Sequence, residues 1–237
     1  MNSSEAKNAI FASIRQHLAA SRPFDSVHEA HHGGHPGLDL TAPVLPELSK
    51  EILIENFQTN LEFVGGKFTA VYDESEAAEV LLSIIKAKNA RKIAFSDSPL
   101  VKKIVGFLKT DAEFIENAPA EVLFESDLGV TGAQWAIAET GTLVLVAESE
   151  RHRLTSLVPP VHVCILEAKN IRQTLGEILG ILQQDLSRTI TFVTGASRTS
   201  DIELTLAIGV HGPGELHVIL IDEMNNETID ETTDEHR

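Results

Sequence analysis

The sequence of 237 residues contains a single cysteine, Cys164. One cysteine cannot form a disulfide within the chain, and one thiolate cannot hold an iron–sulfur cluster, which usually needs four. Aromatic residues make up only 5% of the chain, so we expect a mostly aliphatic core. Because Cys164 lies inside an apolar run, we interpret it as a small buried side chain.

Basic residues are scarce, and long hydrophobic runs are missing. The chain carries 35 acidic residues against 19 basic ones, a net charge of −16. Such a field repels polyanions, which argues against nucleic acid as a partner. The longest uninterrupted apolar run, residues 143–147, is far shorter than the roughly 20 residues of a membrane span. With no signal-peptide pattern either, we expect a cytoplasmic protein without a membrane span.

Composition divides the chain into four parts. Ala6, Ile10, Ile14 and Leu18 recur at every fourth position, which predicts a helical arm over residues 1–21. Residues 22–46 are rich in proline, glycine and histidine and are interpreted as a linker. Residues 47–222 form the predicted α/β domain, and residues 223–237 form an acidic tail that we expect to be disordered.

Within the predicted domain, helical and strand patterns alternate. An Asp73–Glu76 pair is typical of a capping box at a helix start, and Ser98–Pro99 is typical of another helix start. The expected helices cover residues 48–64, a segment after 73, a segment after 98, and 170–186; the expected strands cover 67–72, 92–95, 143–147, 161–166, 190–193 and 216–221. This alternation predicts an α/β fold with a mostly parallel sheet flanked by helices. Gly176 and Gly180, one turn apart, suggest close packing of the last helix on the sheet.

The first candidate site is Glu139, Thr140, Gly141 and Thr142, in the middle of apolar sequence. Thr140–Gly141 suits a tight turn, because glycine tolerates positive φ. In one interpretation the segment is a hairpin with the Glu139 side chain in solvent. In the other, Glu139 ends a strand at the edge where ligands bind to open α/β sheets, and it serves as an acid, a base, a nucleophile or a hydroxyl anchor.

The second candidate site is the segment Ser197, Arg198, Thr199 and Asp201, which follows the strand expected at 190–193. A strand that leads into a capped helix start, with an arginine and hydroxyls nearby, is a ready site for an anion. An ordinary helix cap at Ser200 or Asp201 is the alternative. No nucleotide-binding glycine–lysine loop occurs in the chain.

Histidines supply two further candidates. His211 lies between glycines before the last expected strand, where it is either structural or catalytic. The segment 28–35 holds four histidines that could bind a metal such as Zn²⁺. Because no expected helix or strand supports this segment, we interpret it as a polar linker and assign no metal site.

Three motifs taken together resemble a known family. They are TGAQWAIAETGTLVL (131–145), HRLTSLVPPVHVCIL (152–166) and SRTSDIELTLAIGVHGPGELHVILID (197–222). In this order they resemble the lactate utilisation protein C family, which is built on the LUD domain. The resemblance implies a fold like that of the ribose-phosphate isomerase, glucosamine-phosphate deaminase and CoA-transferase group. That fold is consistent with the parallel sheet expected from the pattern.

The resemblance also implies a role in the bacterial oxidation of L-lactate to pyruvate, together with partner proteins that carry iron–sulfur clusters. The single cysteine is consistent with this division of roles, because the iron–sulfur clusters would lie in the partners and this chain would have no cofactor of its own. In the CoA-transferase relatives a glutamate at a comparable strand end is the nucleophile. By analogy at the level of fold, Glu139 takes that role here.

These observations combine into one hypothesis with two alternatives. Arg198 and the neighbouring hydroxyls are expected to hold a small carboxylate or phosphate in a cleft shared with Glu139 and His211, which would move protons. The chain would then be a non-redox subunit of a lactate-oxidising system. The alternatives are a stand-alone CoA-transferase-like or sugar-phosphate-isomerase-like enzyme that uses Glu139, and a small-anion sensor.

Overall fold

The computed structural model describes residues 46–147, 153–183, 189–199, 207–208 and 212–223. The α-helices are α2 (Lys50–Phe63), α3 (Glu74–Ala87), α4 (Pro99–Phe107), α5 (Ala120–Leu123) and α6 (Leu175–Leu182), with short 3₁₀ turns η2 (Arg153–Ser156) and η3 (Ala168–Asn170). The strands are β1 (Gly66–Val71), β2 (Lys92–Phe95), β3 (Glu113–Glu116), β4 (Leu128–Gly132), β5 (Trp135–Ile137), β6 (Thr142–Val146), β7 (Val161–Glu167), β8 (Ile171–Arg172), β9 (Ile190–Val193), β10 (Arg198–Thr199), β11 (Ala207–Ile208) and β12 (Glu215–Ile221).

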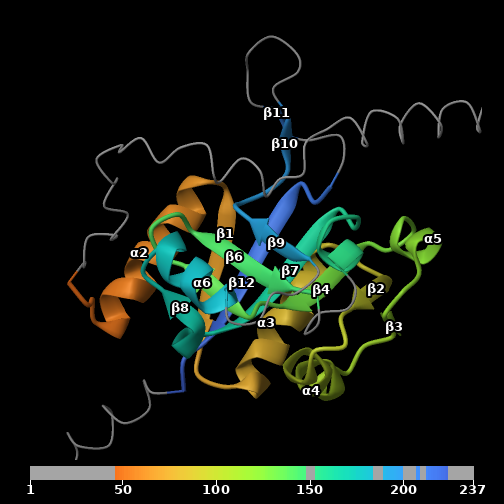
Figure 1. Ribbon diagram of the computed structural model, residues 1–237. Coiled ribbons are helices and arrows are strands. Elements are labelled where there is room, and N and C mark those ends of the chain that lie inside the picture. The colour runs from red at the N-terminus through yellow and green to blue at the C-terminus, as the bar shows by residue number, and fades with distance from the viewer. Residues whose placement is uncertain (1–45, 148–152, 184–188, 200–206, 209–211, 224–237) are drawn as a thin grey trace, which may run out of the picture. The chain divides into compact units, whose positions relative to one another are not determined.

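Six strands form a parallel sheet in the order β1-β12-β7-β4-β2-β3 (Figure 1). Its central strands are buried on both sides: six of the seven residues of β7 and five of the seven of β12 are buried. That is why both read as continuous apolar runs in the sequence. The α/β fold class expected from the sequence is confirmed.

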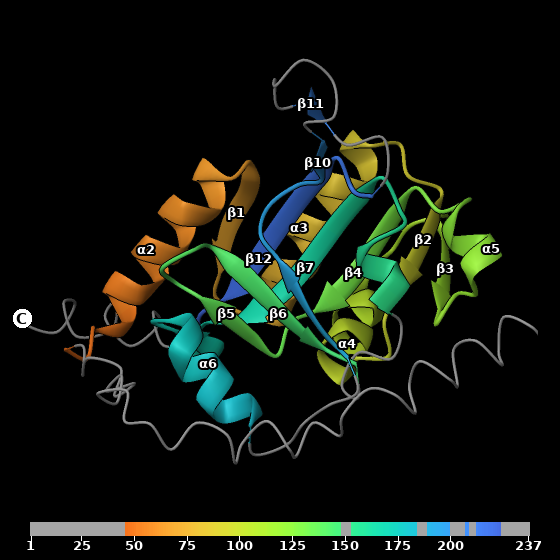
Figure 2. The same cartoon turned by 45° about the horizontal axis from the view of Figure 1, so that its top comes forward.

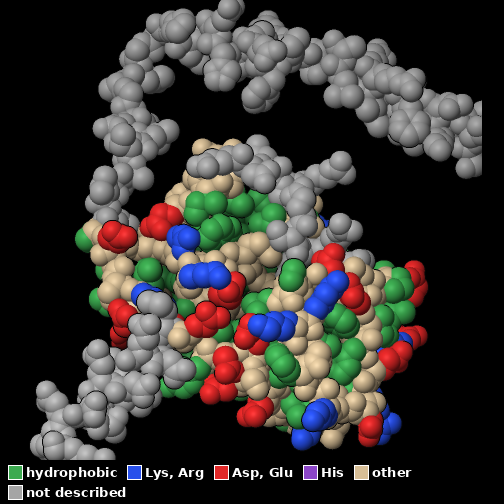
Figure 3. Space-filling model, turned by 90° about the horizontal axis from the view of Figure 1, so that it is seen from below, with side chains coloured by type: hydrophobic (Ala, Val, Ile, Leu, Met, Phe, Trp, Pro, Cys, Tyr) green, Lys and Arg blue, Asp and Glu red, His purple; other side chains and the backbone are tan. Residues whose placement is uncertain are grey.

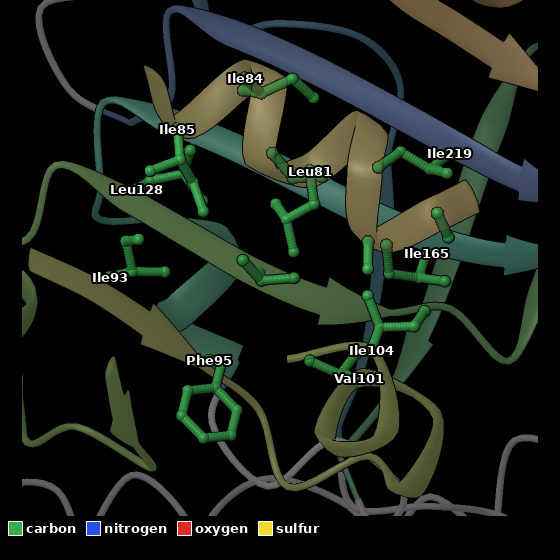
Figure 4. Close-up of a cluster of buried hydrophobic side chains, with 14 of the residues drawn as sticks. Leu81, Ile84, Ile85, Ile93, Phe95, Val101, Ile104, Leu128, Ile165 and Ile219 are labelled. Atoms are coloured by element: carbon green, nitrogen blue, oxygen red, sulfur yellow. The ribbon is translucent and has the colours of Figure 1, made fainter. Parts of the chain in front are cut away.

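The two faces of this large sheet have different covers, and alternate residues of one strand serve them. In β7, Val163 and Ile165 pack with α3 and α4, whereas Cys164 and Leu166 pack with α2 and the second sheet. Figure 4 shows the first cluster, in which Leu81 of α3 and Ile104 of α4 meet the strand residues. Cys164 is fully buried, as expected.

A second, mixed sheet has the order β8-β5-β6-β9 and was not predicted. Its β5–β6 and β6–β9 pairs are antiparallel. Figure 2 shows β5 and β6 in front of β12 and β7, with α3 behind. Helix α6 covers the outer side of this small sheet, where Ile178 and Leu182 pack with Ile137 and Val144.

The last helix is shorter than the sequence predicted. Residues 170–174 are not α-helical: the 3₁₀ turn η3 ends at Asn170 and β8 follows at once. The helix begins at Leu175 because the Thr174 hydroxyl accepts a hydrogen bond from the Glu177 N–H. The prediction that this helix packs closely at its glycines was also wrong, since a Cβ built on Gly180 would meet no atom within 4 Å.

Charged side chains of both signs mix on the surface. On the face shown in Figure 3, Lys and Arg side chains lie among Asp and Glu side chains. Several are paired, as are Lys103 with Glu74 at 2.6 Å and Lys92 with Glu125 at 2.7 Å. No helix in the described part of the chain is long and apolar enough to cross a membrane.

Candidate functional site

A cavity of about 490 Å³ lies beneath the loop that joins β9 to β10. Its lining residues are 192–198 in that loop and its flanking strands, Ser156 and Leu157 at η2, His162 in β7, and Gly212, Pro213 and Leu216 before and in β12. The cavity therefore includes two of the predicted residues, Ser197 and Arg198. It lies at the amino-terminal ends of β7 and β12, not at the carboxyl edge of the large sheet.

The loop is fixed against two other segments. The Ser197 N–H donates to the Pro213 carbonyl oxygen over 2.8 Å. Gly195 has a φ of +84°, and a Cβ there would lie 2.4 Å from the carbonyl oxygen of Val64, just after α2. Only glycine fits this contact. The strand end, the turn after α2 and the segment before β12 thus shape the cavity together.

Arg198 brings the positive charge. Its side chain is exposed, and its Nη2 atom lies so near the turn between α2 and β1 that a Cβ on Gly65 would come within 2.6 Å of it. No carboxylate of the described residues forms an ion pair with this guanidinium. A guanidinium at a cavity wall suits a carboxylate or phosphate, which it can hold through paired hydrogen bonds.

His162 was missed at the sequence level and lies at the cavity wall within the sheet. Its side chain is 1% exposed, and Nε2 lies 2.8 Å from the Thr131 hydroxyl oxygen. Burial lowers the pKa of the imidazole to about 3, so the ring is neutral at neutral pH. The Nδ1 atom is buried without a partner. A histidine inside the apolar run VHVCIL was the available signal, because a polar side chain there must be buried.

Glu139 is not among the residues that line the cavity. It sits in the β5–β6 hairpin of the small sheet, and its Oε1 atom accepts a hydrogen bond from the Leu175 N–H at 2.7 Å. The carboxylate therefore caps the start of α6, where a negative charge is stabilised. The interpretation as a hairpin with an exposed Glu139 is confirmed, and the alternative placement at the carboxyl edge of the parallel sheet is wrong.

The threonines of the same hairpin do connect to the cavity. The Thr140 and Thr142 hydroxyl oxygens lie 2.7 Å apart, and those of Thr142 and Thr194 lie 2.8 Å apart. Thr194 is one of the lining residues. Gly141 has a φ of +64°, and a Cβ there would lie 2.3 Å from the backbone nitrogen of Leu61 in α2. The expected tight turn is therefore present, pressed against a helix.

The other candidates are only partly described or lie outside the described residues. Thr199 belongs to β10 by its backbone. Asp201, His211 and the histidines of residues 28–35 lie outside the described ranges. Among the residues that are described, no three His, Cys, Asp or Glu side chains form a group that could hold a metal ion.

Comparisons with known proteins agree with this architecture. The sequence profile of the LUD domain matches residues 54–221. A lactate utilization protein C of Deinococcus radiodurans is 31% identical over 226 residues, which cover 93% of this chain and 97% of that protein. One from an Exiguobacterium species is 28% identical over 198 residues, 76% of this chain and 83% of the relative.

A solved structure is also similar. The crystal structure of a DUF162 family protein from Deinococcus radiodurans superposes with a TM-score of 0.57 at 25% sequence identity. The match covers 74% of this chain and all of that protein. The architecture described above is therefore shared with an experimentally determined relative.

Proposed function

The chain belongs to the lactate utilization protein C family, which is built on the LUD domain, and from that premise we propose that it is a non-redox subunit of a bacterial system that oxidises L-lactate to pyruvate. In this proposal its partners carry the iron–sulfur clusters, and this chain binds a small carboxylate. The observation that carries the ligand part is the Arg198 guanidinium at the wall of a cavity of about 490 Å³.

In the proposed complex, Arg198 holds the ligand carboxylate through charged hydrogen bonds. Among the described residues no carboxylate forms an ion pair with this guanidinium and would have to be displaced by the ligand. His162 adds a neutral imidazole to the same wall. A neutral ring can form a hydrogen bond with a ligand hydroxyl, and it does not repel the guanidinium. We therefore propose that His162 binds the hydroxyl group of a 2-hydroxy acid.

The reacting role of Glu139 belongs to the alternative proposal, a CoA-transferase-like or sugar-phosphate-isomerase-like enzyme. A carboxylate that accepts a hydrogen bond from the Leu175 N–H is engaged in capping a helix. Use as a nucleophile would require that bond to break. We therefore favour a structural role for Glu139, with the ligand bound elsewhere.

Calorimetric titration with L-lactate and with pyruvate tests the ligand assignment. Replacing Arg198 with alanine is expected to weaken binding by about ten- to a hundredfold, since a hydrogen bond to a charged group contributes roughly 1.5–3 kcal/mol. Arg91→Ala removes an exposed arginine that does not line the cavity and should leave binding unchanged. Equal affinities for wild type and Arg198→Ala, or no binding of either acid to wild type, would overturn the proposal.

Two further measurements separate the alternatives. Capture of the tagged chain from lactate-grown cells, followed by iron analysis, should recover iron-containing proteins if the subunit proposal is right. A stand-alone enzyme would instead turn over alone and lose that activity in Glu139→Gln. The subunit proposal expects Glu139→Gln to retain lactate binding.

A further inference from the structure

A second cavity, of about 570 Å³, opens at the carboxyl edge of the large sheet. It shares no lining residue with the cavity beside Arg198 in the described part of the chain. The segments after β2 and β4 both line it, through Ser98 and Leu100 on one side and through Ala133 and Gln134 on the other. A cavity of this volume has the size of pockets that hold metabolite-sized organic ligands.

The cavity lies at the point where the winding of the sheet reverses. After β2 the chain continues to β3, on one side of β2 in the sheet order. After β4 it continues through the small sheet to β7, on the opposite side. Since β2 and β4 are neighbours, their carboxyl ends splay into a crevice, which is where open parallel sheets bind ligands.

One end of the crevice is rich in hydrogen-bond donors. Helix α4 begins at Pro99, and the Ser98 side chain makes no capping bond to it, so the N–H groups of the first turn lack that partner. The Ser98 side chain is 9% exposed and lines the cavity. Gln134 uses its Oε1 atom to accept the Val146 N–H at 2.6 Å, which leaves its amide NH₂ to donate. These donors suit an anionic group.

The rest of the crevice suits a flat, partly polar body. Trp135 and Leu182 give it an apolar side, and Glu167 and Asn170 give acceptors for hydroxyl groups. The Arg172 guanidinium lies 4.6 Å from the centre of the Trp135 ring, which holds the indole in place. The Glu167 carboxylate is paired with Lys169 at 2.6 Å, which reduces its repulsion of an anion.

We propose that this crevice binds an organic phosphate with a flat ring, of the nucleoside monophosphate class. The phosphate lies at the start of α4 and accepts from the first-turn N–H groups and the Ser98 hydroxyl. Sugar hydroxyls donate to Glu167 and Asn170, and the ring lies against Trp135. This proposal does not rest on lactate binding beside Arg198, because the two cavities share no lining residue among those the structure describes.

The chain carries its own reporter for this site, since Trp135 is its only tryptophan. Titration of the full-length protein with adenosine monophosphate should change the tryptophan fluorescence saturably, with a dissociation constant below about 1 mM. Adenosine should bind at least about tenfold more weakly and inorganic phosphate should give no change, because each lacks half of the contacts. No saturable change with adenosine monophosphate, or equal binding of adenosine, would overturn the proposal.

A matched pair of variants tests the anionic end. Ser98→Asp and Ser98→Asn introduce side chains of nearly equal size, and both are good helix caps that should keep α4 intact. Both changes remove the Ser98 hydroxyl, but only the aspartate adds a negative charge that repels a phosphate, so it should weaken adenosine monophosphate binding at least about tenfold more than the asparagine does. If the aspartate variant binds adenosine monophosphate as tightly as the asparagine variant does, no anion lies at α4. Arg198→Ala should bind adenosine monophosphate as wild type does. Loss of that binding in this variant would contradict the proposal that the two sites are separate.

Discussion

At the level of single side chains, the sequence drew attention to a charged residue of the cavity but not to a buried one. Arg198 was singled out because an arginine and hydroxyls follow an expected strand, and its side chain lines a cavity. His162 was missed because its importance depends on Thr131, 31 residues away, and on a cavity formed by other segments. The hairpin interpretation of Glu139 was right, but its role as a helix cap was missed because its partner, the Leu175 N–H, belongs to a helix whose start was predicted five residues too early.

The buried imidazole of His162 gives the protein a defined sensitivity to acid. Its pKa is lowered from 6.5 to about 3 in the folded chain. Between pH 6.5 and about 3 this histidine is protonated in the unfolded chain but not in the folded chain. The free energy of unfolding therefore falls as the pH decreases toward 3. The loss approaches about 1.4 kcal/mol per pH unit. Above pH 6.5 both states are neutral and the group contributes no pH dependence.

Urea unfolding at pH 7, 6 and 5 measures this effect. His162→Asn removes the titrating group while keeping a polar side chain near Thr131. The variant is expected to be less stable than wild type at pH 7 but to lose less stability on acidification. Other titrating groups are common to both proteins, so the difference between the two slopes isolates His162. Parallel slopes would contradict the burial of a neutral imidazole.

At the level of helices and strands, the sequence predicted correctly those features that depend only on residues close together in the chain. The Asp73 cap is present, with its Oδ1 atom 2.8 Å from the Glu76 nitrogen, and α4 begins at Pro99 as predicted. The small sheet escaped prediction because its pairing joins distant segments, as in the Leu143–Val193 pair. A periodic pattern indicates that a strand exists, but it carries no information about the strand's neighbours.

The glycines of two elements should respond in opposite ways to alanine. Gly141→Ala must place a Cβ 2.3 Å from the Leu61 nitrogen at a φ of +64°, and we expect a loss of more than about 2 kcal/mol. Gly180→Ala adds a methyl group to an exposed helical position with no atom within 4 Å. Helix propensity alone should then add up to about 1 kcal/mol.

Chemical denaturation of the two variants beside wild type tests this contrast. Each variant makes the same covalent change, so the other serves as its control. A stabilised Gly141→Ala would show that the hairpin can move away from α2. A destabilised Gly180→Ala would show that an unrecognised contact covers the outer side of α6.

For the molecule as a whole, the alternation of patterns determined the fold class but left the strand order open. The parallel sheet was predictable because its central strands are apolar on both faces, as Val163 and Cys164 in β7 illustrate. The order β1-β12-β7-β4-β2-β3 was not, since any right-handed winding of the same elements satisfies the pattern. The crevice between β2 and β4 follows from that order, which is why no sequence motif revealed it.

The division of the chain at Leu45 leads to the last prediction. Residues 46–223 contain four buried clusters, two of which cover the opposite faces of the large sheet. A fragment of these residues therefore has the apolar core that a domain of this size needs. We expect it to unfold cooperatively within a few degrees of the full-length melting temperature and to keep the tryptophan fluorescence of Trp135. Circular dichroism and fluorescence melts of both proteins make the comparison. A fragment that melts much earlier would mean that the first 45 residues, interpreted from the sequence as an arm and a linker, contribute to the folded core.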